Sequence, residues 1–253
     1  MQAETKETID LQGRNIRFYH RQQFFQGVKT GMPIAVGYIP IAITFGLVAK
    51  SAGVPTYATM MMSFLIYAGA SQFVGVQLLS LGATPWEILL TTFILNLRHF
   101  LMTASISQRI YKGTSKNWMA LLAFGITDET FTVASLQKEQ RLHPVFLLGL
   151  NLTAFSAWNL GTWTGLFVAA GLPESIQSSM GIALYAMFIG LLIPSLRKSL
   201  PIFVVTLCAM TMQTILHWVP LFSGISGGWE IIISTIISAI IGSLLFPKGV
   251  DES

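Results

Sequence analysis

Charge is scarce in this chain: Lys, Arg, Asp and Glu make up 10% of its 253 residues, whereas 53% of them are hydrophobic. The hydrophobic residues come in long runs rather than in the stripes of an amphipathic helix, which excludes an ordinary soluble domain. Runs of about 20 apolar residues match the hydrocarbon core of a bilayer, and they are too long for barrel strands. Because only helices or closed barrels satisfy backbone polar groups in lipid, the sequence predicts an all-α, polytopic membrane helical bundle.

Cysteine and the common catalytic motifs are also nearly absent. Cys208 is alone, which excludes an intramolecular disulfide and a cysteine metal cluster. The four histidines are far apart, and there is no paired-histidine zinc motif, glycine-rich phosphate loop or nucleophile elbow. We therefore expect no enzyme, no metal and no cofactor. The net charge of +4 arises from 15 basic residues scattered over loops and tails, which indicates no nucleic-acid partner.

Hydropathy divides the chain into about eight segments, separated by breaks rich in glycine and proline. The segments lie near 27–50, 57–82, 84–110, 118–137, 144–170, 174–197, 200–219 and 228–246. They predict a single transmembrane domain over residues 27–247, followed by a short C-terminal tail, 248–253. Residues 1–26 are predicted to be either a polar cytoplasmic tail or an amphipathic helix at the membrane interface.

The distribution of basic residues predicts which loops face the cytoplasm. With a cytoplasmic N-terminus and eight crossings, ten basic residues lie inside, including Lys138 and Arg141. Four lie outside, and three of these, Arg109, Lys112 and Lys116, share one loop. That loop is an exception to the positive-inside rule, and one re-entrant segment would invert everything beyond it.

A weak internal repeat occurs at an offset of 118 residues. It aligns 52–68 with 170–186, where the Gly-x-Pro of each copy and a later Tyr-Ala coincide. Apolar sequence of low complexity also produces such matches by chance, so true duplication and coincidence both stay open. In transporters built from repeats, the substrate binds near the membrane midplane where the halves meet.

Three polar motifs interrupt the apolar segments near their middles, where a charged side chain costs about 2.5 to 3.5 kcal/mol on insertion scales. Such residues normally face a protein interior or a wet cavity, so the motifs predict a shared polar site. The candidate residues for substrate binding or proton coupling are Gly69, Ser71, Gln72, Asn96, Arg98, His99, Asp128 and Glu129.

The first motif combines small residues with Gln72. A helix that unwinds at Gly69 would direct free backbone N–H groups and a positive dipole end at an anion, such as an amino-acid carboxylate. The alternative is a small-residue face that packs against another helix. Gln72 weighs against that alternative, because a glutamine at this depth needs polar partners.

The second and third motifs carry both charge signs. Asn96 and His99 share a helix face while Arg98 points elsewhere. Arg98 is expected to bind a substrate carboxylate or to form an ion pair with Asp128 or Glu129. His99 is either a proton relay or a neutral hydrogen-bonding group. The adjacent carboxylates diverge on a helix, so one is free to load and release protons unless both are structural partners of Arg98.

At these positions the chain resembles the AzlC family, the large subunits of bacterial branched-chain amino acid exporters. The resemblance covers roughly residues 27–245 and rests on Tyr67-Ala68-Gly69-Ala70-Ser71-Gln72-Phe73, Asn96-Leu97-Arg98-His99-Phe100 and Thr127-Asp128-Glu129. It implies a multi-pass protein of the bacterial cytoplasmic (inner) membrane that exports leucine, isoleucine, valine and sometimes methionine. It also implies a much smaller membrane subunit of the AzlD type on a separate chain.

The residues alone predict less: a carrier whose polar midplane site suits a zwitterion and is coupled to protons through a carboxylate. The substrate carboxylate would meet Arg98 or the N–H groups around Ser71, and the ammonium would meet Asp128 or Glu129. Two other functions fit the same motifs. One is a non-transporting membrane scaffold, and the other is a channel for small solutes or ions.

Overall fold

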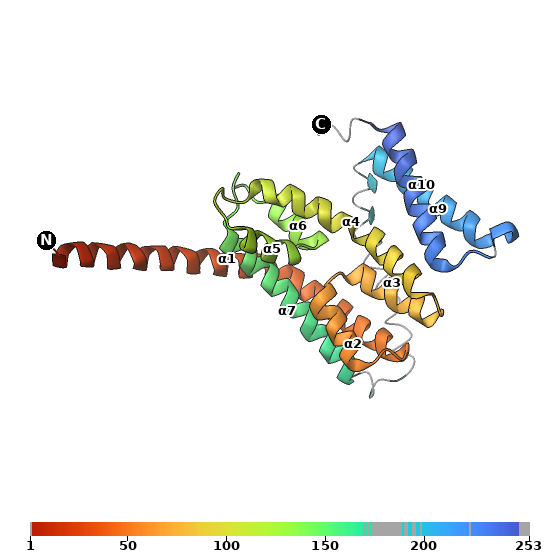
Figure 1. Ribbon diagram of the computed structural model, residues 1–253, viewed down its shortest axis with the longest axis horizontal. Coiled ribbons are helices and arrows are strands. Elements are labelled where there is room, and N and C mark those ends of the chain that lie inside the picture. The colour runs from red at the N-terminus through yellow and green to blue at the C-terminus, as the bar shows by residue number, and fades with distance from the viewer. Residues whose placement is uncertain are drawn as a thin grey trace. The chain divides into compact units, whose positions relative to one another are not determined.

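The computed structural model describes residues 2–168, 171, 173, 189, 192–193, 196–197, 199–222 and 224–247, with side chains from Phe18 onward. The described residues form helices and no β-strand (Figure 1), which confirms the all-α prediction. The elements are α1 (Gln2–Ser51), α2 (Thr56–Met61), the π-helix η1 (Met62–Ile66), α3 (Gly69–Ser80), α4 (Pro85–Arg109), α5 (Lys116–Phe124), α6 (Asp128–Ser135), α7 (Pro144–Val168), α9 (Leu200–Trp218), the 3₁₀ turn η3 (Pro220–Phe222) and α10 (Gly227–Leu245).

The predicted segments match these helices in most cases. The segments at 84–110, 144–170, 200–219 and 228–246 correspond to α4, α7, α9 and α10. The segment at 27–50 is the second part of α1, which also includes the polar residues before it in one helix. The C-terminal tail and most of two other regions lie outside the described residues: the segment at 174–197 and the second copy of the repeat, 170–186.

The expectation of about eight crossings is too high for the part of the chain that the structure describes. Four helices there are long and apolar enough to cross a membrane: Phe18–Ser51, Pro85–Arg109, Leu200–Trp218 and Gly227–Leu245. The segments at 57–82 and 118–137 each break into short helices, of which α3 is the longest at 12 residues. A continuous crossing needs about 20 residues, so the breaks remove two predicted spans. The chain is a multi-pass membrane protein.

The first break lies at Tyr67 and Ala68, between η1 and α3. The π-helix ends at Tyr67, whose backbone is left-handed with φ of 46°. This conformation is unusual for a residue with a bulky side chain, and such outliers cluster at functional sites. The helix resumes at Gly69, so the interruption lies directly before this glycine.

The second break separates α5 from α6 at residues 125–127. Thr127 and Thr130 form a capping box, in which each side chain accepts a hydrogen bond from the backbone N–H of the other. This reciprocal cap starts a new helix at Asp128. The Asn151 side-chain amide donates to the Leu122 carbonyl at 3.0 Å and so adds a second hydrogen bond to a carbonyl that also accepts from the Gly125 N–H at the end of α5.

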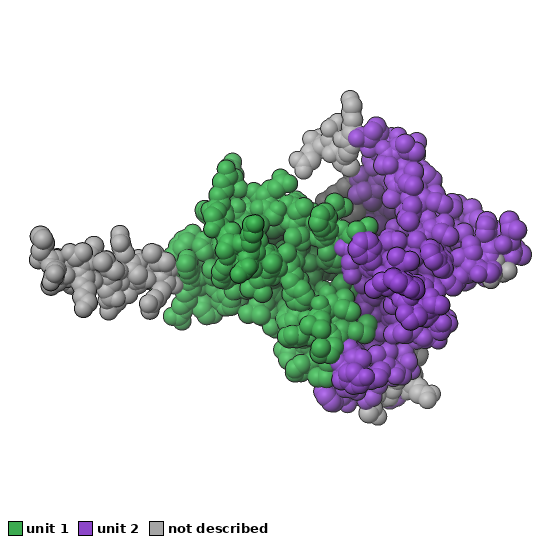
Figure 2. All heavy atoms as spheres, in the orientation of Figure 1, with its two compact units in different colours: residues 1–43, 60–68, 97–164 green, residues 44–59, 69–96, 165–253 purple. Residues whose placement is uncertain are grey.

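The chain divides into two compact units, coloured separately in Figure 2. Unit 1 comprises residues 1–43, 60–68 and 97–164, and unit 2 comprises residues 44–59, 69–96 and 165–253. Helices α1, α2, α4 and α7 therefore contribute residues to both units.

Within unit 1, α1 and α7 cross at very short range. A Cβ atom added to Gly27 would lie 2.0 Å from the Phe146 carbonyl oxygen, and one added to Gly149 would lie 2.3 Å from the Phe24 carbonyl oxygen. Such contacts require glycine on both helices. Because lipid provides no hydrophobic drive for helix association, close backbone packing of small residues stabilises this crossing.

Unit 1 also gathers several loops at one end of its helices. Tyr19 of α1 and Tyr111 of the α4–α5 loop both place their rings against the His143 imidazole, with centroids 5.5 and 5.8 Å away. Burial, followed by the nearby His20, lowers the pKa of His143 below its ordinary value. Its Nδ1 atom accepts from the Val145 N–H at the start of α7.

Arg109 joins the two loops on either side of the α5–α6 pair. Its guanidinium donates to the backbone carbonyls of Ser135, Gln137 and Glu139 at 2.7 to 2.9 Å. The loop that contains Arg109 therefore lies at the same end as residues 137–143. The prediction that these loops lie on opposite sides is wrong, because the segment at 118–137 turns back at its break instead of crossing.

Unit 2 contains α9 and α10, which pack side by side (Figure 1). The Glu87 carboxylate of α4 accepts hydrogen bonds from the Ser226 hydroxyl and, at 2.9 Å, from the Gly228 N–H. An acidic group at a helix start suits the positive end of the helix dipole. Gln213 of α9 donates to Glu230 of α10 at 2.9 Å, so both glutamates have polar partners.

Candidate functional site

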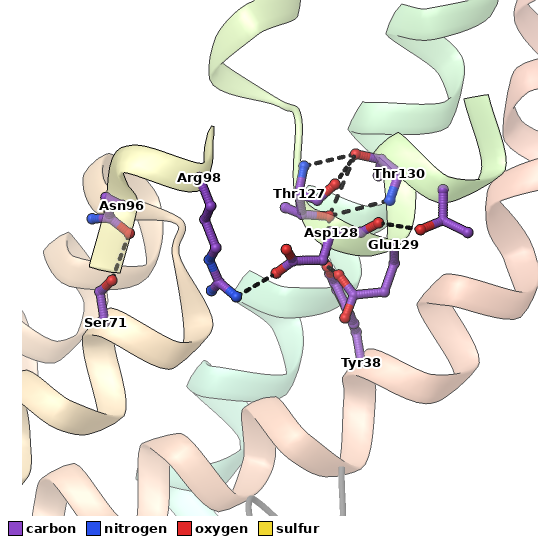
Figure 3. A network of polar contacts seen from close by, with 9 residues as sticks. Tyr38, Ser71, Asn96, Arg98, Thr127, Asp128, Glu129 and Thr130 are labelled. Atoms are coloured by element: carbon purple, nitrogen blue, oxygen red, sulfur yellow. Dashed lines mark hydrogen bonds and ion pairs between the residues drawn. The ribbon is translucent and has the colours of Figure 1, made fainter. Parts of the chain in front are cut away.

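An ion pair connects α4 to the start of α6. Arg98 Nη1 lies 2.9 Å from Asp128 Oδ2, and each side chain is 36% exposed (Figure 3). The sequence left open which carboxylate pairs with Arg98, and the structure assigns Asp128. The buried Nε atom of Arg98 has no hydrogen-bond partner among the described residues. A buried donor without a partner is uncommon in native structures and is a candidate to bind a ligand.

Glu129 has different surroundings from those of Asp128. The buried Tyr38 hydroxyl of α1 donates to a Glu129 carboxylate oxygen and lies 2.7 Å from the Thr127 hydroxyl (Figure 3). Tyr67 has an electrostatic interaction with Glu129, and its own buried hydroxyl has no partner among the described residues. Two tyrosines therefore interact with Glu129: Tyr38 through a hydrogen bond and Tyr67 through electrostatics.

The capping box positions both carboxylates. Because Thr127 and Thr130 fix the first turn of α6, Asp128 and Glu129 occupy the first two helical positions, where the backbone N–H groups make the potential positive. The two residues diverge by about 100° around the helix. Their divergence allows Asp128 to contact α4 while Glu129 contacts α1.

The remaining candidates with described partners belong to unit 2. The Ser71 hydroxyl in the first turn of α3 donates to Asn96 Oδ1 of α4 at 2.5 Å (Figure 3). Gln72 is fully buried beside it in sequence, and Gly69 is the first residue of the helix. In unit 1, His99 is half-buried on α4.

The sequence did not indicate that Tyr38 and Asn151 belong to the site. It also gave no sign that the Tyr67 hydroxyl takes part in it. Isolated tyrosines and asparagines are frequent in membrane helices, so their side chains carried no distinctive signal. The nearest signal for Tyr67 was its place directly before the small-residue stretch at 68–71. Tyr38 lies in α1 between Pro33 and Pro40, and prolines bend a helix without marking a polar site.

Comparison with known proteins identifies the family. Residues 33–172 match the AzlC protein family. The chain belongs to the AzlC family. It is 34% identical over 181 residues to the inner membrane protein YgaZ of Escherichia coli, a match covering 69% of this chain and 74% of that protein. A membrane protein of Archaeoglobus fulgidus is 35% identical over 176 residues, with coverage of 69% and 76%.

A further relative has a functional name. The branched-chain amino acid transport protein AzlC of Bacillus subtilis is 29% identical over 136 residues, which cover 51% of this chain and 53% of that protein. No solved structure matches this chain. Membership of the AzlC family gives the chain a role in membrane transport, and it confirms the resemblance found in the polar motifs.

Proposed function

We propose that this chain is the large subunit of a secondary transporter that exports branched-chain amino acids, and other apolar ones such as methionine. It acts with a small membrane subunit of the AzlD type, encoded as a separate chain. The name of the Bacillus subtilis relative supports the substrate class. The contacts of Arg98, Asp128 and Glu129 in this chain carry the argument.

The observation that carries the proposal is the incomplete pairing of Arg98. One guanidinium nitrogen binds Asp128, and the buried Nε atom has no partner in the described part of the chain. A substrate carboxylate would use this donor without separating the ion pair, which keeps the guanidinium neutralised when the site is empty. The substrate ammonium would bind Glu129, whose carboxylate accepts a hydrogen bond from the Tyr38 hydroxyl and has no ion pair among the described residues.

Glu129 is also the proposed proton carrier. Protonating Asp128 would break the ion pair with Arg98. Protonating Glu129 would require only that its hydrogen bond with Tyr38 reverse, so that the acid donates to the phenol oxygen and the phenol donates to Thr127. This hydrogen-bond chain therefore tolerates both protonation states of Glu129, as coupling to a proton gradient requires.

The orientation follows from the basic residues at the loop end of unit 1. This end has Arg21, Arg109, Lys112, Lys116, Lys138 and Arg141 in its loops and adjoining helix. The positive-inside rule assigns such an end to the cytoplasm. Gly69, Ser71, Gln72, Asn96 and His99 stay predictions for the transport pathway, since their roles are untested.

The test is transport of radiolabelled leucine, valine and methionine into proteoliposomes that contain this chain with its small partner, under an imposed pH gradient. Saturable flux that depends on the gradient and disappears in Glu129→Gln supports the proposal. Flux without saturation would indicate a channel instead. Absence of flux through a well-folded complex with its small subunit would instead indicate a non-transporting scaffold. The Arg98–Asp128 ion pair would then serve only to hold helices together.

A further inference from the structure

We propose that Tyr67 is a positioning residue for Glu129. Its hydroxyl is a second donor, which bonds to the ionised carboxylate in another state of the transport cycle, alongside the Tyr38 hydroxyl that bonds to it in this structure. The inference rests on the proposed function, in which Glu129 carries the proton, and it names a residue that sets the pH range of coupling. Tyr38, Tyr67 and Glu129 all belong to unit 1.

The Tyr67 and Tyr38 rings occupy neighbouring positions on α7. The Tyr67 ring packs edge to face against Phe155, with centroids 5.0 Å apart. The Tyr38 ring packs in the same way against Trp158 at 5.4 Å. Residues three apart on a helix share a face, so α7 holds the two phenols as neighbours. Because Tyr38 already donates to Glu129, and Tyr67 interacts electrostatically with both, the second hydroxyl lies in the surroundings of the same carboxylate.

The Tyr67 hydroxyl is buried without a partner. The residue is 3% exposed, and its hydroxyl forms no hydrogen bond with the described residues. Phe124 of α5, with its ring centroid 6.1 Å away, holds the Tyr67 ring from a second side. An unpaired buried hydroxyl costs free energy, which a phenylalanine of the same shape avoids. A tyrosine at this position therefore indicates a hydrogen-bond partner that the hydroxyl acquires in another state.

The backbone fixes where the Tyr67 ring lies. Tyr67 ends η1 in the left-handed conformation, which a bulky residue keeps only where its surroundings hold it. The turn before it is attached to α7, since the Ser63 and Thr162 hydroxyls share a hydrogen bond of 2.8 Å. With the ring held in this way, a rotation of the Glu129 side chain, rather than a movement of Tyr67, makes the proposed contact.

The charges around Glu129 show what a second hydroxyl contributes. The surrounding elements carry these titratable or charged groups in the same region: Tyr38 of α1, Tyr67 at the break, Arg98 and His99 of α4, and Asp128 of α6. Arg98 and Asp128 neutralise each other, and α7 has no titratable residue. Ionised Glu129 therefore depends on dipoles, which are hydroxyl donors and the first-turn N–H groups of α6. A donor hydroxyl favours the ionised form of a carboxylate, so Tyr67 would promote release of the proton.

The test is the pH dependence of leucine exchange in proteoliposomes that contain the chain with its small partner, with equal pH on both sides. The substrate ammonium binds ionised Glu129, so exchange falls on the acid side as this group takes up its proton. In Tyr67→Phe we expect the acid side of the profile to move upwards by about 1 pH unit, because a carboxylate with one donor fewer keeps its proton to higher pH. Thermal stability in nanodiscs should stay the same or rise, because the lost hydroxyl has no partner in this structure.

Two other tyrosines provide the comparisons. Tyr57→Phe removes an exposed hydroxyl on α2 and should change neither the pH profile nor the stability. Tyr38→Phe removes a donor that is bonded in this structure and should lower the stability. Leucine exchange with an unshifted profile in Tyr67→Phe would overturn the inference alone. A loss of stability as large as that of Tyr38→Phe would also overturn it, since the Tyr67 hydroxyl would then be bonded already, for example to buried water. Absence of leucine transport by the unmodified complex would instead overturn the proposed function, and the inference with it.

Discussion

Variants of the Arg98–Asp128 ion pair can show whether Arg98 only stabilises the fold or also binds substrate. Arg98→Gln and Asp128→Asn each leave one charge without its counter-ion, and a hydrogen bond to a charged group contributes about 1.5 to 3 kcal/mol. Both side chains are 36% exposed, so water partly screens the pair. We therefore expect the free energy of unfolding of each single variant to fall by an amount near the lower end of that range. The double variant removes both charges and leaves two amides able to bond to each other.

We therefore expect the double variant to recover at least about 1 kcal/mol relative to the sum of the single changes. Thermal unfolding in nanodiscs measures this recovery, and leucine flux in proteoliposomes measures function. Transport should be lost in Arg98→Gln and in the double variant, because both remove the guanidinium that binds the substrate carboxylate. Arg141→Gln, which removes an exposed guanidinium that binds backbone carbonyls, is the control for the loss of positive charge. A double variant that regains both stability and transport would refute the substrate-binding role.

Three further predictions test other parts of the structure. Glu129→Gln removes both the titratable group and the carboxylate that binds the substrate ammonium, so pH-driven accumulation of labelled leucine should be lost; unchanged accumulation would remove Glu129 from coupling. His143 has a lowered pKa through burial and a neighbouring histidine, so the unfolded chain binds its proton first as pH falls below about 6.5. Thermal stability should therefore fall with acidification below that value, and His143→Gln should flatten the dependence. Gly27→Ala should destabilise by about 1 to 3 kcal/mol, because its Cβ would meet the Phe146 carbonyl; Gly37→Ala on the same helix, with open space around it, should be close to neutral.

Composition and hydropathy were sufficient to predict the membrane bundle and most helix positions. Pro85 and Pro144 each start a helix at a predicted boundary, since proline is favoured in the first turn. The interruption directly before Gly69 was one of two alternatives that the sequence offered, the other being a small-residue packing face. The second interruption was not predicted, although Gly125 and the Thr127–Thr130 pair are a recognisable stop and start signal once their helical context is known.

Long apolar segments conceal such breaks because hydropathy averages over them. The segment at 118–137 is apolar enough to resemble a span, yet its capping box starts a second helix at Asp128. As a result α6 ends at the same end of unit 1 at which α5 begins. Arg109 therefore donates to carbonyls of residues that the predicted eight crossings put on the opposite side of the membrane. Counting spans from hydropathy therefore gave the wrong side for this loop.

The sequence by itself determined that the chain lies in a membrane, that its polar residues concentrate in three motifs, and that these match the AzlC family. Those properties depend on residue identity and local order, which the sequence states directly. Only the tertiary structure decided that Asp128 pairs with Arg98, that Glu129 meets Tyr38, and that Asn151 bonds to the end of α5. These contacts join residues up to 91 positions apart, so they depend on how helices pack and where they break rather than on any local pattern.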